Sequence, residues 1–196
     1  MPESTPKTGR SKCAVHLSDS RVLRAYTHPT RVKLVRLLRV EGPLTVTRAS
    51  ELTGESMDSC SHHLRMPAEY GLVEEAEGGQ GREKYGRAAA RYITWKGADR
   101  EAAEDLNTAV AELNFERITH AIETRQRLPC EWREAEQFGD DIIYPAAAEL
   151  AELEERVSAL LESCGERFDD PSWLPEGAEP VTVLRIAVRN CREDAS

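Results

Sequence analysis

A short run of polar side chains between residues 56 and 65 could hydrogen-bond to nucleotide bases and phosphates. Ser59, Ser61 and His62 are small donors and acceptors, and Arg65 adds a planar guanidinium with several donors. Such a guanidinium suits phosphate oxygens and the major-groove edge of guanine. The candidate contacts of this segment are Ser56, Ser59, Ser61, His62 and Arg65.

These side chains need a helix to present them. Ser56 is a good N-cap and Gly71 a good terminator, so residues 56–70 are predicted to be helical. Helical spacing puts Cys60, Leu64 and Ala68 on one inward face and leaves the polar residues largely on the others. An α-helix of this kind fits the major groove of B-DNA. His63, next to Leu64, could be either a contact or a structural residue.

The neighbouring segments predict the rest of one small domain. Helices are expected over residues 19–26, over 30–41 after the His28-Pro29 pair, and over 46–53, where Thr45 is the N-cap and Gly54 the terminator. Extended segments 72–76 and 83–88 flank a glycine-rich turn, which indicates a β-hairpin. The order of helix, turn, helix and hairpin is that of a winged helix-turn-helix.

In this order, five stretches resemble the arsenic-repressor-type (ArsR-like) winged-helix regulators. The resemblance covers residues 18–95 and implies a DNA-binding domain, with the recognition helix 56–70 in the major groove and the wing 72–88 on the adjacent minor groove or phosphates. It further implies that Thr45, Thr47 and Arg48 lie near the DNA backbone and that the hairpin offers Gln80, Arg82, Lys84 and Arg87. The matching stretches are HPTRVKLVRLLRVEG (28–42), LTVTRASELTG (44–54), SHHLR (61–65), YGLV (70–73) and GREKYGR (81–87).

Pro67 departs from the family pattern, which usually has an apolar residue such as leucine at this position. Proline inside a helix removes one hydrogen bond and costs ~3 kcal/mol in an ideal interior. The recognition helix is therefore expected to kink or to end early near Met66. The half of the helix that would contact DNA lies before this point.

The charge is divided between the two halves of the chain. The 196 residues carry a net charge of -9, but residues 1–96 hold 16 lysines and arginines against 11 acidic residues, a net of +5. Residues 97–196 hold 10 against 24, a net of -14. A basic first half suits a polyanion-binding module, and the acidic second half suits another role.

The second half is predicted to be built on two long helices. One covers about residues 100–127 and ends before Pro129; the other follows Pro145. In the second helix Leu150, Leu153, Val157, Leu160 and Cys164 form an a/d seam, which could pack on the chain's own core or on a second copy. Strands are expected at 137–144 and 181–188. The similarity of this half to the extended helical tails of actinobacterial members is much looser.

The predicted fold class is α+β and mostly helical. It comprises a flexible N-terminal arm (1–17), a winged helix-turn-helix domain (18–96), and a helical region for dimerisation and effector sensing (97–196) with one or two short strands. The arm carries Lys7, Arg10 and Lys12, which could touch phosphates.

Three signals could act on such a regulator. Metal-sensing members of the family carry a cysteine pair that is missing from residues 47–54 of this chain. Another branch of the family binds zinc through a pattern of which His120 and Glu123 match only half. Neither a metal site nor a cofactor is therefore predicted. Cys60 could be a redox switch, although a small buried residue is the favoured interpretation. A small-molecule effector could bind among four aromatic residues of the second half, which are favoured as core: Trp132, Phe138, Tyr144 and Trp173.

Other classes of protein find little support in the sequence. No nucleophile elbow, phosphate-binding loop or zinc-protease motif occurs, and the adjacent Asp140 and Asp141 would point to opposite faces of a strand. The five cysteines are scattered, and neither a signal peptide nor a membrane-spanning run is found, so a cytoplasmic location is expected.

The leading hypothesis is a homodimeric transcriptional regulator, a repressor or an activator without enzymatic activity. Its two recognition helices would lie ~34 Å apart on a pseudo-palindromic operator in double-stranded DNA. The alternative is a protein-interaction module on a winged-helix scaffold, whose acidic second half docks a protein partner.

Overall fold

The computed structural model describes residues 12–76, 84–95, 97–169 and 171–190. Its first part contains the helices α1 (Ser20–Tyr26), α2 (Pro29–Glu41), α3 (Val46–Thr53) and α4 (Met57–Glu69). Local signals explain their ends: Pro29 is the first residue of α2, Thr45 and Ser56 accept backbone hydrogen bonds as N-caps, and Gly54 ends α3 in the left-handed conformation. The predicted helices of this part are confirmed.

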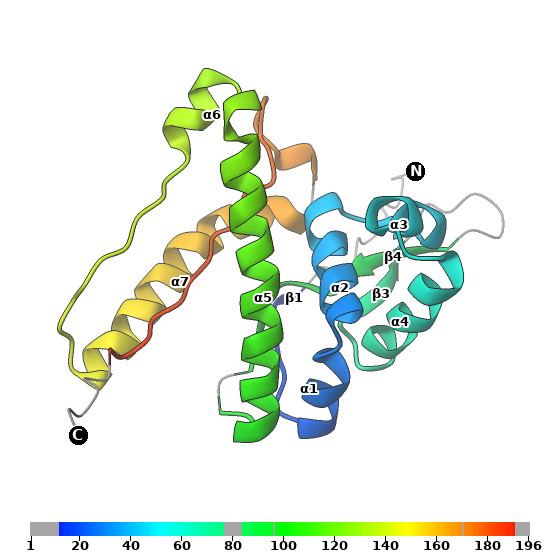
Figure 1. Ribbon diagram of the computed structural model, residues 1–196, viewed down its shortest axis with the longest axis horizontal. Coiled ribbons are helices and arrows are strands. Elements are labelled where there is room, and N and C mark those ends of the chain that lie inside the picture. The colour runs from blue at the N-terminus through cyan, green and yellow to red at the C-terminus, as the bar shows by residue number, and fades with distance from the viewer. Residues whose placement is uncertain (1–11, 77–83, 96, 170, 191–196) are drawn as a thin grey trace, which may run out of the picture.

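A three-stranded antiparallel sheet closes the first part. Strands β2 (Leu44–Thr45), β4 (Tyr85–Ala88) and β3 (Val73–Ala76) lie in that order, with Val73 opposite Ala88 and Thr45 opposite Tyr85. The antiparallel pairing of β3 and β4 confirms the predicted hairpin strands. Figure 1 shows this sheet beside α2, α3 and α4, the arrangement of a winged helix-turn-helix.

The predicted N-terminal arm is wrong for the residues that the structure describes. Residues 12–16 form β1 (Lys12–His16), which pairs in parallel with β5 (Ala90–Thr94), and Leu17 is buried in the core. Strand pairing satisfies the backbone polar groups of this segment, which an isolated arm would leave to water. The parallel pairing joins segments almost eighty residues apart, so no local pattern could indicate it.

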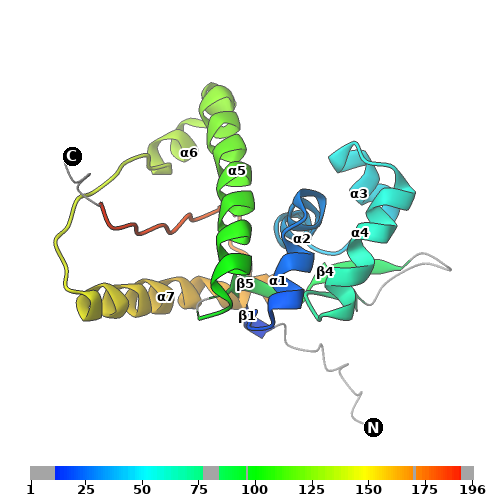
Figure 2. The ribbon, with the colours of Figure 1, turned by 60° about the horizontal axis from the view of Figure 1, so that its bottom comes forward.

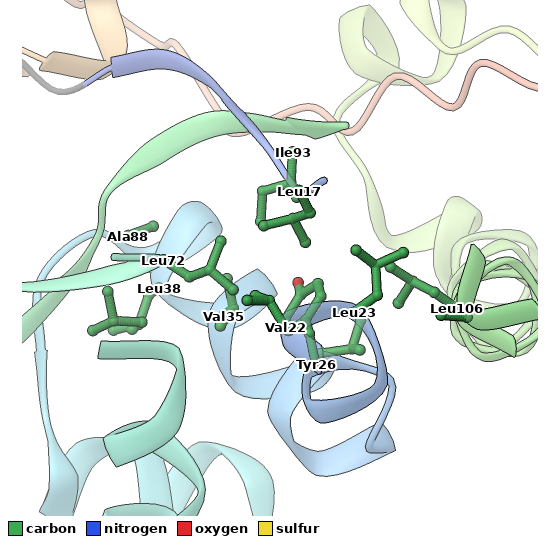
Figure 3. Packing of buried hydrophobic residues seen from close by; sticks show 13 residues of the cluster. Leu17, Val22, Leu23, Tyr26, Val35, Leu38, Leu72, Ala88, Ile93 and Leu106 are labelled. Carbon is green, nitrogen blue, oxygen red and sulfur yellow. The ribbon is translucent and has the colours of Figure 1, made fainter. Parts of the chain in front are cut away.

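One hydrophobic core unites these elements with the long helix α5 (Arg100–Thr124). Leu23 and Tyr26 of α1, Val35 of α2 and Leu106 of α5 are buried together, and Figure 3 shows Leu106 beside Leu23. A second, smaller cluster of Leu34, Ala49 and Cys60 packs α2, α3 and α4 together. The long helix is therefore anchored on the winged domain at its N-terminal end.

Beyond α5, the chain is more open. A 3-10 turn (Arg125–Arg127) and α6 (Cys130–Ala135) precede α7 (Ala147–Asp169), and a second 3-10 turn (Pro171–Trp173) follows it. Residues 181–190 run between α5 and α7 (Figures 1 and 2), where Arg117 donates to Thr182 and Arg185 donates to Glu154 and Ser158. Both long helices are as predicted.

Several predictions for this second half are wrong. Residues 137–144 and 181–188 form no strand and pair with none of the described strands. Phe138, Tyr144 and Trp173 are 51%, 96% and 56% exposed, so they form neither a core nor a closed pocket. The acidic pair 140–141 is likewise on an exposed, unpaired segment rather than a strand.

Candidate nucleic-acid interface

Helix α4 has one buried face and one polar exposed face. Cys60 is fully buried, Leu64 packs against both hydrophobic clusters, and Pro67 is also buried. Ala68 is exposed, so the prediction that it packs inward is wrong and Pro67 takes that place. The opposite face exposes Ser61, His62 and Arg65.

The predicted early end of this helix near Met66 is also wrong. The helix continues through Pro67 to Glu69, and Leu72 N–H donates to the Pro67 carbonyl at 2.8 Å. Proline there leaves only the His63 carbonyl without its usual helical donor. The Pro67 ring is fully buried, and removing its apolar surface from water offsets part of that loss.

Arg65 is the cation of this face that is most available to a ligand. In the part of the chain that the structure describes, it makes no ion pair and no hydrogen bond from its side chain. Ser56 is the N-cap and accepts from Ser59 N–H at 3.1 Å. The Ser59 hydroxyl donates to Glu55 at 3.0 Å and is half-buried, so Ser59 is a weaker candidate than Ser61.

Helix α3 lies beside α4 and supplies two of the predicted contacts, and its N-cap Thr45 is a third. Thr45 Oγ1 accepts from Arg48 N–H at 3.1 Å, which occupies this hydroxyl as an N-cap. Thr47 and Arg48 are exposed, and Arg48 pairs with Glu51 at 2.8 Å. Thr47 Oγ1 lies 3.7 Å from Met57 Sδ, which brings the start of α3 next to the start of α4.

The wing cations are paired with carboxylates of the adjacent strand. Lys84 contacts Glu75 at 2.9 Å and Arg87 contacts Glu74 at 2.7 Å. The Lys84–Glu75 pair is exposed, and an exposed ion pair is worth only about 0–1 kcal/mol, so a phosphate group can replace this carboxylate. The Arg87 side chain is only 25% exposed, so its carboxylate is less readily replaced. Gln80 and Arg82, the other predicted wing contacts, lie outside the described residues.

Three histidine rings pack together where α4 meets the start of α2. The His63 ring centroid lies 4.4 Å from that of His28 and 5.1 Å from that of His62. His28 Nδ1 accepts from Thr30 N–H at 3.2 Å, so this side chain is the N-cap of α2. Desolvation, with the neighbouring His28, Arg31 and His62, lowers the pKa of His63. His63 is therefore a packed ring that supports His62, a role that its sequence position left open.

Cys60 and a metal site are the remaining candidates for sensing a signal. Cys60 Sγ is buried, 3.7 Å from Thr53 Oγ1 in the cluster beneath α4, as expected for a small packing residue. Among the described residues, no three His, Cys, Asp or Glu side chains are grouped to hold a metal ion. Within the same residues, no helix has the length and apolarity needed to cross a bilayer.

Comparison with known proteins locates the domain within the chain. Residues 26–76 match the family model described as "Helix-turn-helix domain". No curated protein matches the chain.

Two solved structures are similar over about half the chain. One is a homodimeric winged helix-turn-helix DNA-binding domain from Mycobacterium bovis, described as a possible ArsR-family transcriptional regulator. It is 22% identical, with 48% of this chain and 77% of that chain covered and a TM-score of 0.33. The other, described as a possible transcriptional regulator for arsenical resistance, is 26% identical, covers 50% and 93%, and has a TM-score of 0.31. At these TM-scores, neither similarity assigns a property to this chain.

The family match begins at the end of α1, includes α2, α3 and α4, and ends with β3. The strands that follow α4 add the hairpin of the winged form. Residues 26–76 of this chain are therefore a helix-turn-helix domain, and the structure gives it the winged architecture.

Proposed function

We propose that the protein is a transcriptional regulator that binds double-stranded DNA, with the exposed face of α4 in the major groove. The observation that carries this proposal is the exposed face of Ser61, His62 and Arg65 on a helix whose other face is fixed in the core. A helix that is packed on one face and exposes polar side chains on the other is the geometry that base contacts require.

The other elements supply backbone contacts in this proposal. Thr47 lies next to the start of α4, and Arg48 is the exposed residue that follows it, so both suit phosphates in this proposal. Lys84 and Arg87 would exchange their strand carboxylates for phosphates of the adjacent groove. Each such exchange releases counterions, so affinity should fall steeply with added salt.

The test is a binding measurement on the gene's own promoter region over a range of salt concentrations. If Arg65 contacts a base, Arg65→Gln should weaken binding by about 1–3 kcal/mol. If Arg65 contacts a phosphate, the variant should also reduce the slope of log K against log salt concentration by about one. Arg100→Gln is the matched control, because Arg100 lies on α5 in an exposed pair with Glu104. Equal binding by both variants, or no salt-dependent binding at all, would refute the proposal and leave the protein-interaction module as the alternative.

The homodimer that a palindromic operator requires is proposed to form through α5. Phe115, Ile118 and Ile122 are 71%, 37% and 58% exposed and share one face of this helix at spacings of three and four. A contiguous exposed apolar stripe is typical of a protein interface. Two copies joined here would present their two α4 helices to successive turns of the duplex.

Sedimentation measurements test this part separately. The wild type should have twice the mass of one 21.9 kDa chain, and Phe115→Lys should have the mass of one chain. Tyr144→Lys is the control, because this residue is 96% exposed on a segment outside α5. A wild type that stays monomeric at micromolar concentration, or a Phe115→Lys variant that stays dimeric, would contradict dimerisation through α5.

A further inference from the structure

Four arginines gather where the winged domain meets the C-terminal region. Arg36 and Arg39 belong to α2, Arg91 to β5 and Arg117 to α5, and all four are half-buried. Arg39 lies within electrostatic range of Arg36 and Arg91, and Arg117 within range of Arg36 and Arg39. Elements separate in sequence thus bring four like charges together.

These charges have no carboxylate in ion-pair contact among the described side chains. In the described part of the chain, none of the four arginines forms an ion pair. Their only side-chain partners are neutral: Arg36 donates to the amide oxygen of Asn114, and Arg117 donates to the hydroxyl of Thr182. The Nε atoms of Arg39 and Arg91 are buried and have no hydrogen-bond acceptor.

This arrangement is costly for the isolated chain. Desolvation, followed by repulsion from neighbouring arginines, lowers the pKa of Arg39 and of Arg117, and desolvation lowers the pKa of Arg36. Arginine nevertheless remains protonated in proteins, so the site keeps its charge. All four side chains are half-buried, so each charge is partly removed from water, and charges removed from water are normally paired. An anion bound here would supply the countercharge that the described side chains lack.

We propose that this arginine cluster, Arg36, Arg39, Arg91 and Arg117, binds a small multivalent oxyanion that carries phosphate or carboxylate groups. Guanidinium groups are planar forks that bind both kinds of oxyanion with two parallel hydrogen bonds. Several forks from different elements around one anion would favour a ligand with more than one charge. The unsatisfied Nε donors would also gain an acceptor.

The cluster is separate from the proposed DNA-binding surface. Figures 1 and 2 place α5 and α4 on opposite sides of α2, and the Arg36 contact with Asn114 shows that the cluster faces α5. Through Thr182, the C-terminal segment reaches the same place. A bound anion would therefore connect α2 of the helix-turn-helix domain, β5, α5 and the C-terminal segment, which makes this site suited to a regulatory ligand.

Thermal unfolding and calorimetry of the full chain test the site with sulfate, phosphate and citrate, each against sodium chloride of equal ionic strength. A specific site gives a saturable rise in Tm, about 3–6 °C at ten times Kd for a chain of this size. General salting effects on burial do not saturate in this way. A stronger response to phosphate than to citrate would assign the ligand to the phosphorylated class, and the reverse to the polycarboxylates.

The variants Arg39→Gln and Arg117→Gln should lose most of this shift, while their anion-free Tm stays equal or rises because repulsion is relieved. Arg100→Gln, an exposed arginine of α5, should keep the shift. The sulfate response should be the same at pH 6 and pH 8, because arginine does not titrate there; binding at the histidines near α4 would weaken at pH 8.

Three results would overturn the proposal. One is an anion-induced Tm shift that is the same in Arg117→Gln as in the wild type. If Arg39→Gln fails to fold, the result for Arg117→Gln is decisive by itself. Another is a rise matched by sodium chloride or absent altogether. The third is a shift that appears only on dilution of the protein, which would show that acidic groups of a second copy fill the cluster.

Discussion

Replacing Leu106 with alanine tests whether α5 belongs to the core of the winged domain. Leu106 is fully buried and lies beside Leu23, which is also fully buried (Figure 3). The substitution removes three carbons, worth about 2.4 kcal/mol at ~0.8 kcal/mol each, and the remaining cavity raises the loss to about 3–4 kcal/mol. For a chain of this length, Tm should fall by about 6–16 °C.

Urea unfolding at one fixed protein concentration is the assay, because dimerisation would make the stability depend on concentration. Leu160→Ala is the matched control: Leu160 is 72% exposed, so its loss should change stability by less than about 0.5 kcal/mol. A loss below about 1 kcal/mol for Leu106→Ala would refute the reasoning. So would a separate, earlier transition for α5 in the wild type, since it would mean that α5 unfolds independently of the winged domain.

The remaining predictions concern titration and backbone conformation. Burial raises the pKa of Tyr26 to about 12, so stability should fall by roughly 2–3 kcal/mol between pH 10 and 12 as the unfolded state ionises first, an effect that Tyr26→Phe removes. Because the pKa of His63 is lowered, stability should decrease as the pH falls below 6.5. NMR should find the His63 ring still neutral at a pH at which a free histidine is protonated, and a titration like that of free histidine would contradict this prediction. Gly54→Ala should cost about 1–2 kcal/mol in urea unfolding because Gly54 has φ +75, whereas Gly139→Ala should be neutral.

Helix boundaries in the first half could be predicted from the sequence because local chemistry sets them. Thr45 and Ser56 provide side-chain acceptors for free amides, and Gly54 adopts a left-handed conformation at low cost. These preferences act within one helical turn and need no knowledge of the rest of the chain. The hairpin strands were predictable for the same reason, and with them the position of Arg65 on the exposed face.

Interactions between distant segments could not be predicted in this way. The 181–188 stretch has a strand-forming composition, but it forms no strand because its neighbours α5 and α7 offer no backbone partner. Lys84 and Arg87 looked like free wing cations, yet they lie opposite Glu75 and Glu74 once β3 and β4 pair. The composition alone does not show which charges meet across a sheet.

The sequence by itself determined the winged domain, since caps, helical periodicity and the hairpin are local features that all indicate one fold. Only the tertiary structure decided that residues 12–16 form a strand with β5, that Pro67 lies buried within α4, and that Arg39 and Arg117 come within electrostatic range of each other. Each of these depends on contacts between residues far apart in the chain. Their free energies arise only when the elements pack, so no local window of the sequence contains them.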